Sequence, residues 1–296
     1  MRINNNNFQR NANISMVAQT IWRKPGISRI DIARELNLYR STVTNIIQTL
    51  IDAKVVYEAE EGEVTSQGGR RPILLRINER MGCVLGLELQ VDRFRAVVVD
   101  VYGTTLHQLE GTVQSRHFSE VFAEVVERMR PVVESTRLPL LGICVGLPGI
   151  VNPDDCTIIK SDPFKLENYP FGKEVGCNYP VPVFIENDAN CCAWEALARH
   201  RDSALQDFLC VLAEHHGHND ATGLGPGMGV GMALVLGGKL HYGKRYAAGE
   251  FTSVLWRPGD GSQFGMSFQE MARIQQDDEV YKTFVAELFE SLKPVV

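Results

Sequence analysis

The pattern of apolar residues changes at Asn78, and this change constrains the fold more than any other feature of the sequence. Before Asn78 the apolar positions recur at helical spacing, and after it runs typical of strands dominate. Strands are expected at 83–90, 94–103, 104–113, 140–151, 182–188, 208–214 and 229–243, with a helix at 118–134. Strand sets followed by helices, occurring twice, predict a two-lobed α/β body with a cleft, its lobes at 82–186 and 187–296.

The first 77 residues predict a separate head domain of three short helices. The first, at 14–24, ends before Pro25-Gly26, and the second begins after Ser28, which has capping-box spacing to Asp31. The third helix, expected within 40–56, carries one apolar stripe and one polar face. The stripe consists of Val43, Ile46, Ile47 and Leu50. The polar face includes Thr42, Thr44, Asn45, Gln48 and Thr49.

Three short helices whose third presents polar side chains indicate a helix-turn-helix domain, in which that helix enters the major groove of DNA. The alternative is a plain three-helix bundle in which Ser41 is only an N-cap. Residues 55–77 favour the first interpretation, since they alternate like two strands around the tip Gly-Gly-Arg-Arg-Pro. Such a hairpin is typical of a wing, with Arg70 and Arg71 placed to enter a minor groove or to bind phosphates. An acidic run from Glu58 to Glu63 on the same hairpin has to face away from DNA.

The distribution of charge agrees with a head that meets a polyanion. Residues 1–80 hold 12 Lys and Arg against 8 Asp and Glu, whereas the remaining 216 residues hold 18 against 28. The head therefore carries +4 and the body −10. The seven cysteines are odd in number and include no CxxC pair, so we expect neither a disulfide framework nor a cysteine zinc site. No signal peptide or membrane span is recognisable, and a cytoplasmic protein is expected.

Four further motifs make the resemblance to a known family specific. They are GLELQVDRFRAVVVDVYG, GICVGLPGIV, FIENDAN and GMGVGMALVLGGKLHYGKRYAAGEF, in this order behind the GRRP wing. Together they resemble the regulator branch of the ROK (repressor, ORF, kinase) family, over nearly the whole chain. The resemblance implies an actin/hexokinase-like, ribonuclease-H-like fold for the body, with a sugar bound between its lobes.

The resemblance also implies the sugar-binding residues. Asn187 and Asp188 match the family's Asn-Asp pair that binds sugar hydroxyls, and Glu250 matches a Glu that binds another hydroxyl. The turn at 145–149, with Gly146, Pro148 and Gly149, matches a backbone segment that lines the same pocket. Carboxylates and an amide offer the paired acceptors and donors that adjacent hydroxyls need. An alternative role for Asp188 is to cap the helix that follows it.

The chain departs from the family pattern in three places. The stretch ELQVD, residues 88–92, stands where family kinases carry a DxGxT-like phosphate loop, and it has neither glycine nor threonine. Ser253 stands where a sugar- and zinc-binding His is usual, and no cysteine follows Cys210, so no metal site is expected. The chain also ends early, which predicts an incomplete second lobe. HHGH at 215–218 is more typical of a solvated loop than of a metal site.

The glycine-rich stretch 223–231 leaves two interpretations open, a nucleotide-binding loop or a tight turn between strands. The leading hypothesis for the whole chain is a sugar-responsive transcription factor, a repressor that binds a DNA operator as a homodimer and needs no cofactor. Its DNA-binding residues are Arg40, Ser41, Thr42, Thr44, Asn45, Arg70 and Arg71. One rival is an ATP-dependent sugar kinase with a DNA-binding head, and another is a regulator that no longer senses a ligand.

Overall fold

The structure is a computed structural model that describes residues 5–61, 71–201, 205–216, 227–258, 260 and 262–294. It divides into two compact units. The first consists of Met1–Cys83 with two short segments, Val99–Thr105 and Arg137–Pro139. The second consists of Val84–Val98, Leu106–Thr136 and Leu140–Val296. Each unit has its own hydrophobic core.

Three helices form the head, as the sequence predicts: α1 (Asn5–Arg23), α2 (Arg29–Glu35) and α3 (Arg40–Asp52). Ser28 is the N-cap of α2, and its Oγ accepts a hydrogen bond from the amide of Asp31. The predicted stripe of α3 is buried in full and packs on apolar side chains of α1 and α2. The N-cap of α3 is Tyr39, so the alternative that Ser41 caps this helix is wrong.

The wing hairpin is confirmed in its two strands, β2 (Val56–Glu61) and β3 (Ile73–Ile77), which pair antiparallel. A two-residue strand, β1 (Ile27–Ser28), pairs with the other edge of β3 and was not predicted. It gives the head a three-stranded sheet of order β1-β3-β2. The tip of the wing, including Arg70, lies outside the described residues.

The segment Val99–Thr105 belongs to the first unit because its side chains pack on the helices and strands of the head. The indole Nε1 of Trp22 donates a hydrogen bond of 2.8 Å to the carbonyl oxygen of Val101. The hydroxyl of Tyr102 accepts from the amide of Ile77 at 2.9 Å, and burial raises the pKa of this phenol. A short 3-10 helix, Glu79–Met81, follows β3.

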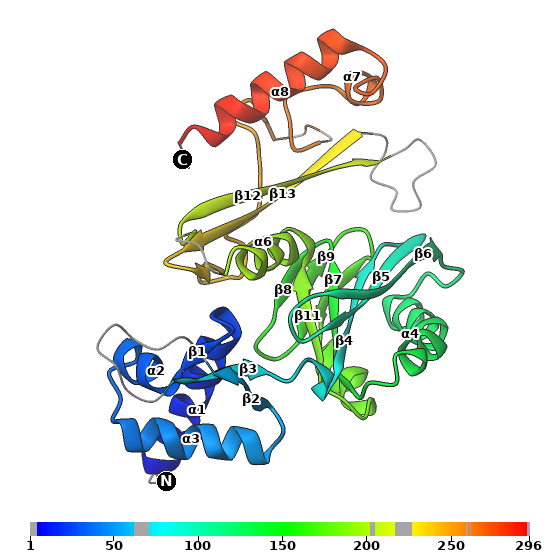
Figure 1. The fold of residues 1–296 in the computed structure, drawn as a ribbon. Coiled ribbons are helices and arrows are strands. Elements are labelled where there is room, and N and C mark those ends of the chain that lie inside the picture. The colour runs from blue at the N-terminus through cyan, green and yellow to red at the C-terminus, as the bar shows by residue number, and fades with distance from the viewer. Residues whose placement is uncertain are drawn as a thin grey trace. The chain divides into compact units, whose positions relative to one another are not determined.

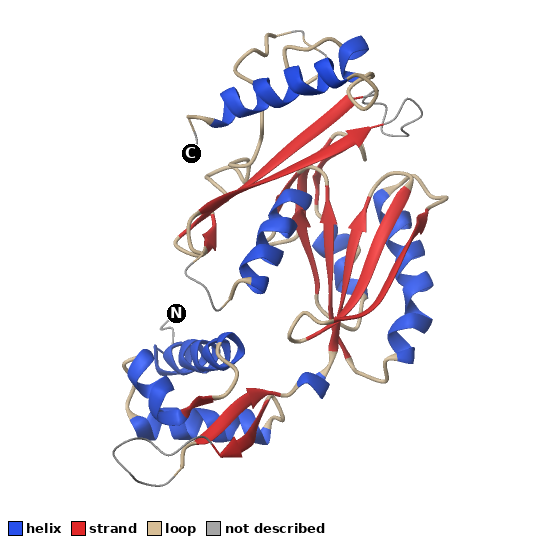
Figure 2. Cartoon of the chain, turned by 45° about the horizontal axis from the view of Figure 1, so that its top comes forward, coloured by secondary structure: helices blue, strands red, loops and turns tan. Residues whose placement is uncertain are grey.

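The second unit is built on a five-stranded sheet of order β11-β7-β4-β5-β6, which Figure 1 and Figure 2 show fanning beside helix α4. Its strands are β4 (Cys83–Leu89), β5 (Arg93–Asp100), β6 (Thr105–Thr112), β7 (Leu140–Leu147) and β11 (Val183–Asn187). All five overlap predicted strands, but the strand predicted at 140–151 ends at Leu147 and the one predicted at 94–103 ends at Asp100. Helix α4 (Phe118–Ser135) buries an apolar face of Phe118, Val121, Phe122, Val125 and Met129.

A small sheet follows β7 and was not predicted. Its order is β10-β9-β8, from β8 (Ile150–Asn152), β9 (Thr157–Ser161) and β10 (Leu166–Tyr169). Two short helical turns, α5 (Phe171–Glu174) and 176–178, close the segment. The ring of Phe171 packs edge-on against Phe118 and Phe122 of α4, which fixes this insertion on the first lobe.

The second lobe begins with helix α6 (Asp188–Arg199), which contacts β7 and β11 on one side and the next sheet on the other (Figure 1). That sheet has the order β12-β13-β14, from β12 (Phe208–His216), β13 (Gly227–Leu236) and β14 (Lys239–Leu240). Two helices were not predicted, α7 (Phe268–Met271) and α8 (Asp278–Leu292). Met271 of α7 and Phe284 of α8 share one core cluster with Val230 of β13 and with Phe264 of the preceding loop. Throughout the described part of the chain, every helix is too short or too polar to cross a membrane.

Candidate functional site

Two parallel strands bring the predicted motifs VGLPG and FIENDAN together. Strands β7 and β11 pair in parallel, with Gly146 opposite Glu186 and Leu147 opposite Asn187. The carboxyl ends of parallel strands lie at the same edge of a sheet, where ligands of α/β proteins commonly bind. At that edge the amide nitrogen Nδ2 of Asn187 donates to the carbonyl oxygen of Gly149 at 3.0 Å. This hydrogen bond joins the two turns.

The start of helix α6 holds both residues of the Asn-Asp pair. Asn187 is the N-cap, since its Oδ1 accepts from the amide of Asn190 at 3.1 Å. The alternative that Asp188 caps this helix is therefore wrong: Asp188 is its first residue. Its Oδ1 accepts from Nδ2 of Asn187 and from the amide of Ala189, both at 2.9 Å. A carboxylate in the first turn also interacts favourably with the helix dipole.

The carboxyl of Asp188 has a pKa raised to about 6. Its removal from water is the largest cause, and the nearby carboxylates of Glu214 and Glu88 raise it further, against the hydrogen bond from Ala189. A low-dielectric surrounding disfavours the charged form of an acid. Near neutral pH this carboxyl is ionised although its burial disfavours the charged form. A ligand hydroxyl that donates a hydrogen bond to the carboxylate therefore stabilises it strongly.

A small cavity of about 40 Å3 lies beside this helix start. The residues that line it are Gly149, Asn187, Asn190, Val230, Gly231, Met232, Tyr246, Gly249, Glu250 and Phe251. Asp188 adjoins it, because a Cβ on Gly231 would lie 4.0 Å from the Asp188 Oδ1. The structure thus brings together four of the predicted sugar-binding residues, Gly149, Asn187, Asp188 and Glu250. Gly146 packs against the Sγ of Cys191, and the carbonyl of Pro148 accepts from Ser161; neither is among the lining residues.

Glycine backbone forms a large part of the cavity wall. Gly149 has φ +136°, and a Cβ there would lie 2.3 Å from the carbonyl oxygen of Lys160. A Cβ on Gly249 would lie 1.8 Å from the carbonyl oxygen of Met232. Both are far inside contact distance with main-chain atoms, so these positions require glycine. Gly231 pairs with Glu250 in an isolated β-bridge, and both residues line the cavity.

Glu250 remains largely exposed, yet partial removal from water raises the pKa of its carboxyl. The nearby ammonium of Lys160 opposes that rise. The polar side chains that line the cavity therefore include the carboxylate of Glu250 and the amides of Asn187 and Asn190, and the carboxylate of Asp188 adjoins it. Each carboxylate can accept from a ligand hydroxyl, and each amide can both donate and accept.

Three polar residues of the site were missed by sequence reasoning. Asn190 lines the cavity, and its Nδ2 donates to Oε1 of Glu186 at 2.9 Å. The hydroxyl of Tyr242 donates to Oε2 of the same carboxylate at 2.6 Å. Tyr246, also in the lining, donates to Oδ2 of Asp154 at 3.0 Å. Asn190 follows Asn187 at helical spacing, so the sequence pattern could have indicated it. The two tyrosines lie in a loop without a periodic pattern of apolar residues, so no such pattern could have indicated them.

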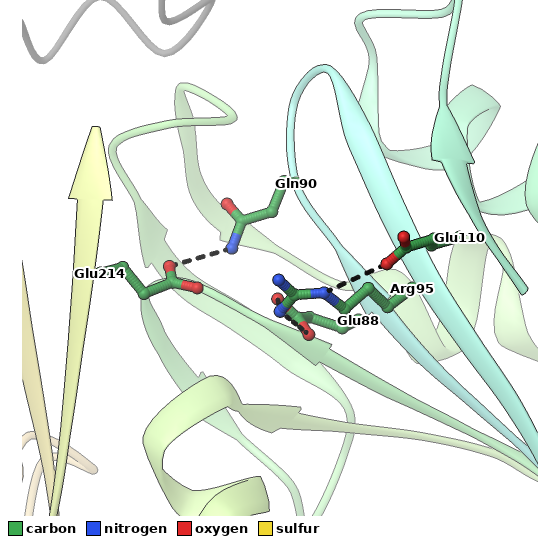
Figure 3. A network of polar contacts seen from close by, with 5 residues as sticks. All are labelled: Glu88, Gln90, Arg95, Glu110 and Glu214. Atoms are coloured by element: carbon green, nitrogen blue, oxygen red, sulfur yellow. Dashed lines mark hydrogen bonds and ion pairs between the residues drawn. The ribbon is translucent and has the colours of Figure 1, made fainter. Parts of the chain in front are cut away.

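The turn after β4, where the sequence departs from a phosphate loop, carries a network of carboxylates (Figure 3). Arg95 of β5 pairs with Glu88 of β4 at 3.3 Å and lies 4.0 Å from Glu110 of β6. The buried side chain of Gln90 donates to Glu214 of β12 at 3.3 Å. One guanidinium among three carboxylates leaves this corner net negative, which is unfavourable for a nucleotide phosphate.

Ser253, at the position of the missing His, does not line the cavity. It is buried, and its hydroxyl donates to the carboxylate of Glu287 on α8. The same carboxylate accepts from the amide of Gly265 at 2.7 Å. Among the described residues, no group of three or more His, Cys, Asp and Glu could hold a metal ion. Of HHGH, residues 217 and 218 lie outside the described part.

The predicted DNA-binding side chains lie on the outer face of α3 and at the base of the wing. Arg40, Ser41, Thr44 and Asn45 are exposed, and Thr42 is half-buried. Arg71 is exposed at the start of β3. Glu58, from the acidic run of the hairpin, is paired with Arg29 at 2.6 Å, which neutralises part of that run. Tyr39, at the entrance to α3, is 85% exposed and was not predicted as a contact.

Fold and site together define a protein with a winged helix-turn-helix head and an α/β body that carries a small polar cavity. The model of the ROK family matches residues 84–256, more than half of the chain, and a winged helix-turn-helix DNA-binding model matches residues 19–57. The chain belongs to the ROK family. The resemblance drawn from its motifs is thereby confirmed.

Several relatives of the chain are named xylose repressors. The xylose repressor of Staphylococcus xylosus is 31% identical over 252 residues, which cover 84% of this chain and 62% of that protein. The xylose repressor of Caldicellulosiruptor bescii is 28% identical over 250 residues, covering 83% and 59%. The chain thus spans about three fifths of the length of these relatives.

A solved structure shares the fold of the chain. It is a ROK family transcriptional regulator described as a homolog of the E. coli MLC protein. It superposes with a TM-score of 0.68 at 22% identity, covering 90% of this chain and 68% of that one. The predicted fold class, a helix-turn-helix head followed by an α/β body, is confirmed.

Proposed function

We propose that the protein is a sugar-responsive, DNA-binding transcriptional regulator, a repressor that leaves its operator when a sugar binds the cavity beside α6. The observation that carries this proposal is the joining of two features in one chain. A winged helix-turn-helix head precedes, in the sequence, a body whose cavity is lined by Asn187 and Glu250 and adjoined by Asp188. The domain boundaries we propose are 1–77 for the head and 82–186 and 187–296 for the lobes.

The cavity chemistry supports a monosaccharide as the effector. Ionised Asp188 and Glu250 accept from ligand hydroxyls, while Asn187 is held by Gly149 and Asp188 at a fixed orientation. Hydrogen bonds to a charged acceptor are stronger than neutral ones, and they discriminate sugars by the position of each hydroxyl. Because relatives are named xylose repressors, xylose is the first candidate.

The head supports recognition of double-stranded DNA. The exposed side chains at the start of α3, Ser41, Thr44 and Asn45, can reach base edges in the major groove. Arg40 and Arg71 can contact phosphates, and Arg70 is assigned to the wing by sequence alone. Homodimers of such heads bind two half-sites. A sugar that favours one conformation of the body would change the spacing of the paired heads and weaken DNA binding.

A non-catalytic role is favoured over phosphoryl transfer. Catalysis by kinases is chiefly the positioning and charge stabilisation of phosphate groups. At the turn after β4 this chain offers Glu88 and Glu214 around Gln90. Carboxylates at this position repel a nucleotide. Asp188 can therefore bind a sugar hydroxyl, but no phosphate is held nearby for transfer to that hydroxyl. We place the protein in the cytoplasm, where its DNA lies, and assign it no cofactor.

The experiment that tests this function compares wild type with Asp188→Ala. Operator fragments captured from the protein's own genome are bound in a mobility-shift titration with xylose, arabinose, glucose and N-acetylglucosamine. We expect one sugar to release wild type and to leave Asp188→Ala bound with unchanged DNA affinity. Glu167→Ala, which removes an exposed carboxylate from β10, is the matched control and should respond like wild type. Release of Asp188→Ala by the same sugar would overturn the pocket assignment, and sugar-dependent ATP consumption would revive the kinase.

A further inference from the structure

Tyr246 occupies a distinctive place in the cavity, and the inference drawn from it rests on the proposed sugar-binding function. Its ring lines the cavity, and its hydroxyl donates to Oδ2 of Asp154 in the turn after β8. The ring also lies 6.1 Å from that of Tyr242, whose hydroxyl is fixed on Glu186. Tyr246 therefore reaches from the loop after β14 to the β8–β9 turn of the first lobe.

The cavity as it stands encloses little space. One water molecule needs roughly 10–15 Å3 by this measure, so about 40 Å3 holds about three waters. A monosaccharide that is to be enclosed by the lining residues therefore needs part of that lining to move.

Most of the lining is fixed in place. The backbone of Gly149 and of Gly249 lies close to other main-chain atoms, because a Cβ added there would lie 2.3 Å and 1.8 Å from a carbonyl oxygen. Val230 and Phe251 belong to the buried core of the second lobe. Three further side chains, Asn187, Asn190 and Met232, are hydrogen-bonded to neighbours or packed on that core.

Tyr246 is held more weakly than these residues. Its side chain makes one exposed hydrogen bond, to Asp154, and one tilted ring contact, with Tyr242. Such a surface bond contributes on the order of 1 kcal/mol, little enough for a ligand to displace. Tyr246 and the exposed Glu250 are therefore the lining side chains that can move at the least cost, and Tyr246 is the larger of the two.

The backbone of Tyr246 gives a second, independent reason to regard its side chain as functional. Its φ is +58°, a conformation that glycine adopts freely and that a bulky residue adopts at a cost of about 1 kcal/mol. Within the described ranges, it is the one aromatic residue with a positive φ. A strained residue is retained where its side chain is needed.

We propose that Tyr246 determines which sugars the cavity admits. Its ring turns aside for a compact monosaccharide of pentose size, and it collides with sugars that carry a bulky exocyclic group such as an N-acetyl substituent. Asp154 is a positioning residue, since it holds the hydroxyl of Tyr246 when no ligand is bound. The selectivity comes from the volume of the ring, and the hydrogen bond sets only its resting position.

Calorimetric titration of the full chain with xylose, glucose and N-acetylglucosamine tests this proposal. Tyr246→Gly removes the ring at a backbone angle that suits glycine, and we expect it to lower the preference for xylose over N-acetylglucosamine about tenfold or more. Tyr246→Phe keeps the ring and loses the bond to Asp154, so its preference should stay near that of wild type. Tyr281→Phe, at an exposed tyrosine of α8 away from the cavity lining, is the matched control. Tyr246→Asn, also tolerant of positive φ, replaces the glycine variant if that does not fold.

An unchanged preference in Tyr246→Gly overturns the proposal, as does a loss of preference in Tyr246→Phe equal to that in the glycine variant. Failure of both wild type and Tyr246→Gly to bind any of the three sugars overturns it together with the pocket. Calorimetry keeps this test separate from DNA release. If Tyr246→Gly shifts the sugar preference but no sugar releases the protein from DNA, the role of Tyr246 stands and the repressor mechanism is refuted. If a sugar releases the protein from DNA but Tyr246→Gly leaves the preference unchanged, the repressor mechanism stands and the role of Tyr246 is refuted.

Discussion

Replacing Asp188 with Asn should stabilise the body of the protein, and the gain should depend on pH. The folded-state pKa of this carboxyl is about 6, against an ordinary value of 3.8. Because the folded pKa is raised, the proton stabilises the folded state. That stabilisation is complete below pH 3.8 and is lost as pH rises through 6. Each pKa unit corresponds to about 1.4 kcal/mol, so ionisation of Asp188 costs the fold about 3 kcal/mol above pH 7.

An amide has nearly the same shape and no charge to desolvate. The free energy of unfolding of Asp188→Asn relative to wild type should therefore increase with pH, by about 1.5 kcal/mol at pH 5 and about 3 kcal/mol at pH 7 to 8 over its value in acid. Asn also keeps an oxygen that can accept from Asn187 and Ala189, as the Asp188 Oδ1 does.

Urea unfolding between pH 5 and pH 8 measures this difference. Trp22 is the tryptophan of the head, so a Trp22→Phe background leaves Trp194 and Trp256 to report on the body alone. Glu167→Gln, on an exposed carboxylate, is the control and should stay within about 0.5 kcal/mol of wild type at every pH. A difference for Asp188→Asn that does not change with pH, or a uniform loss of stability, would refute the argument from burial and the neighbouring Glu214 and Glu88.

Three further predictions concern the pH dependence of sugar binding, a glycine of the cavity wall and the core of the head. Sugar affinity should weaken as pH falls below about 6, because the sugar hydroxyl binds ionised Asp188, and calorimetry of Asp188→Asn should show a weaker dependence that belongs to Glu250. Gly149→Ala should lower the melting temperature of the body and abolish sugar binding, since its Cβ would lie 2.3 Å from a carbonyl oxygen; Gly176→Ala, with 3.6 Å to the nearest atom, should be tolerated. Ile47→Ala, in the buried stripe of α3, should destabilise the head by about 2–5 kcal/mol in urea unfolding and weaken DNA binding with it, whereas Gln19→Ala, at an exposed position of α1, should do neither.

The sequence predicted elements whose residues repeat with one clear period. The apolar stripe of α3 and the alternation of β4, with every second residue buried, follow directly from side-chain geometry. Strand β1 is two residues long, and only its pairing with β3 makes it a strand. Helix α8 buries the polar residues Glu287 and Ser291 toward Ser253, so its apolar pattern is interrupted where tertiary hydrogen bonds replace it.

The candidate site was predictable where contiguous motifs carry it and unpredictable where a loop completes it. FIENDAN predicted a strand that ends at Asn187 and Asp188, and the family resemblance put the turn at Gly149 in the same pocket. In the structure β11 ends at Asn187, and its Nδ2 donates to the carbonyl oxygen of Gly149. Tyr246 lies ninety-two residues from its hydrogen-bond partner Asp154, and neither local sequence contains a pattern that predicts this contact. Such pairs become visible only when the chain is folded.

Capture of genomic fragments on the purified protein, with elution by one sugar after another, tests the central claim most directly. A sugar-responsive repressor should retain one or a few palindromic sites at physiological salt and release them to a single monosaccharide, with no release from the Asp188→Ala protein. Weak capture without sequence preference, lost steeply with rising salt and indifferent to every sugar, would contradict the claim, because it would leave only the general attraction between a basic head and DNA phosphates.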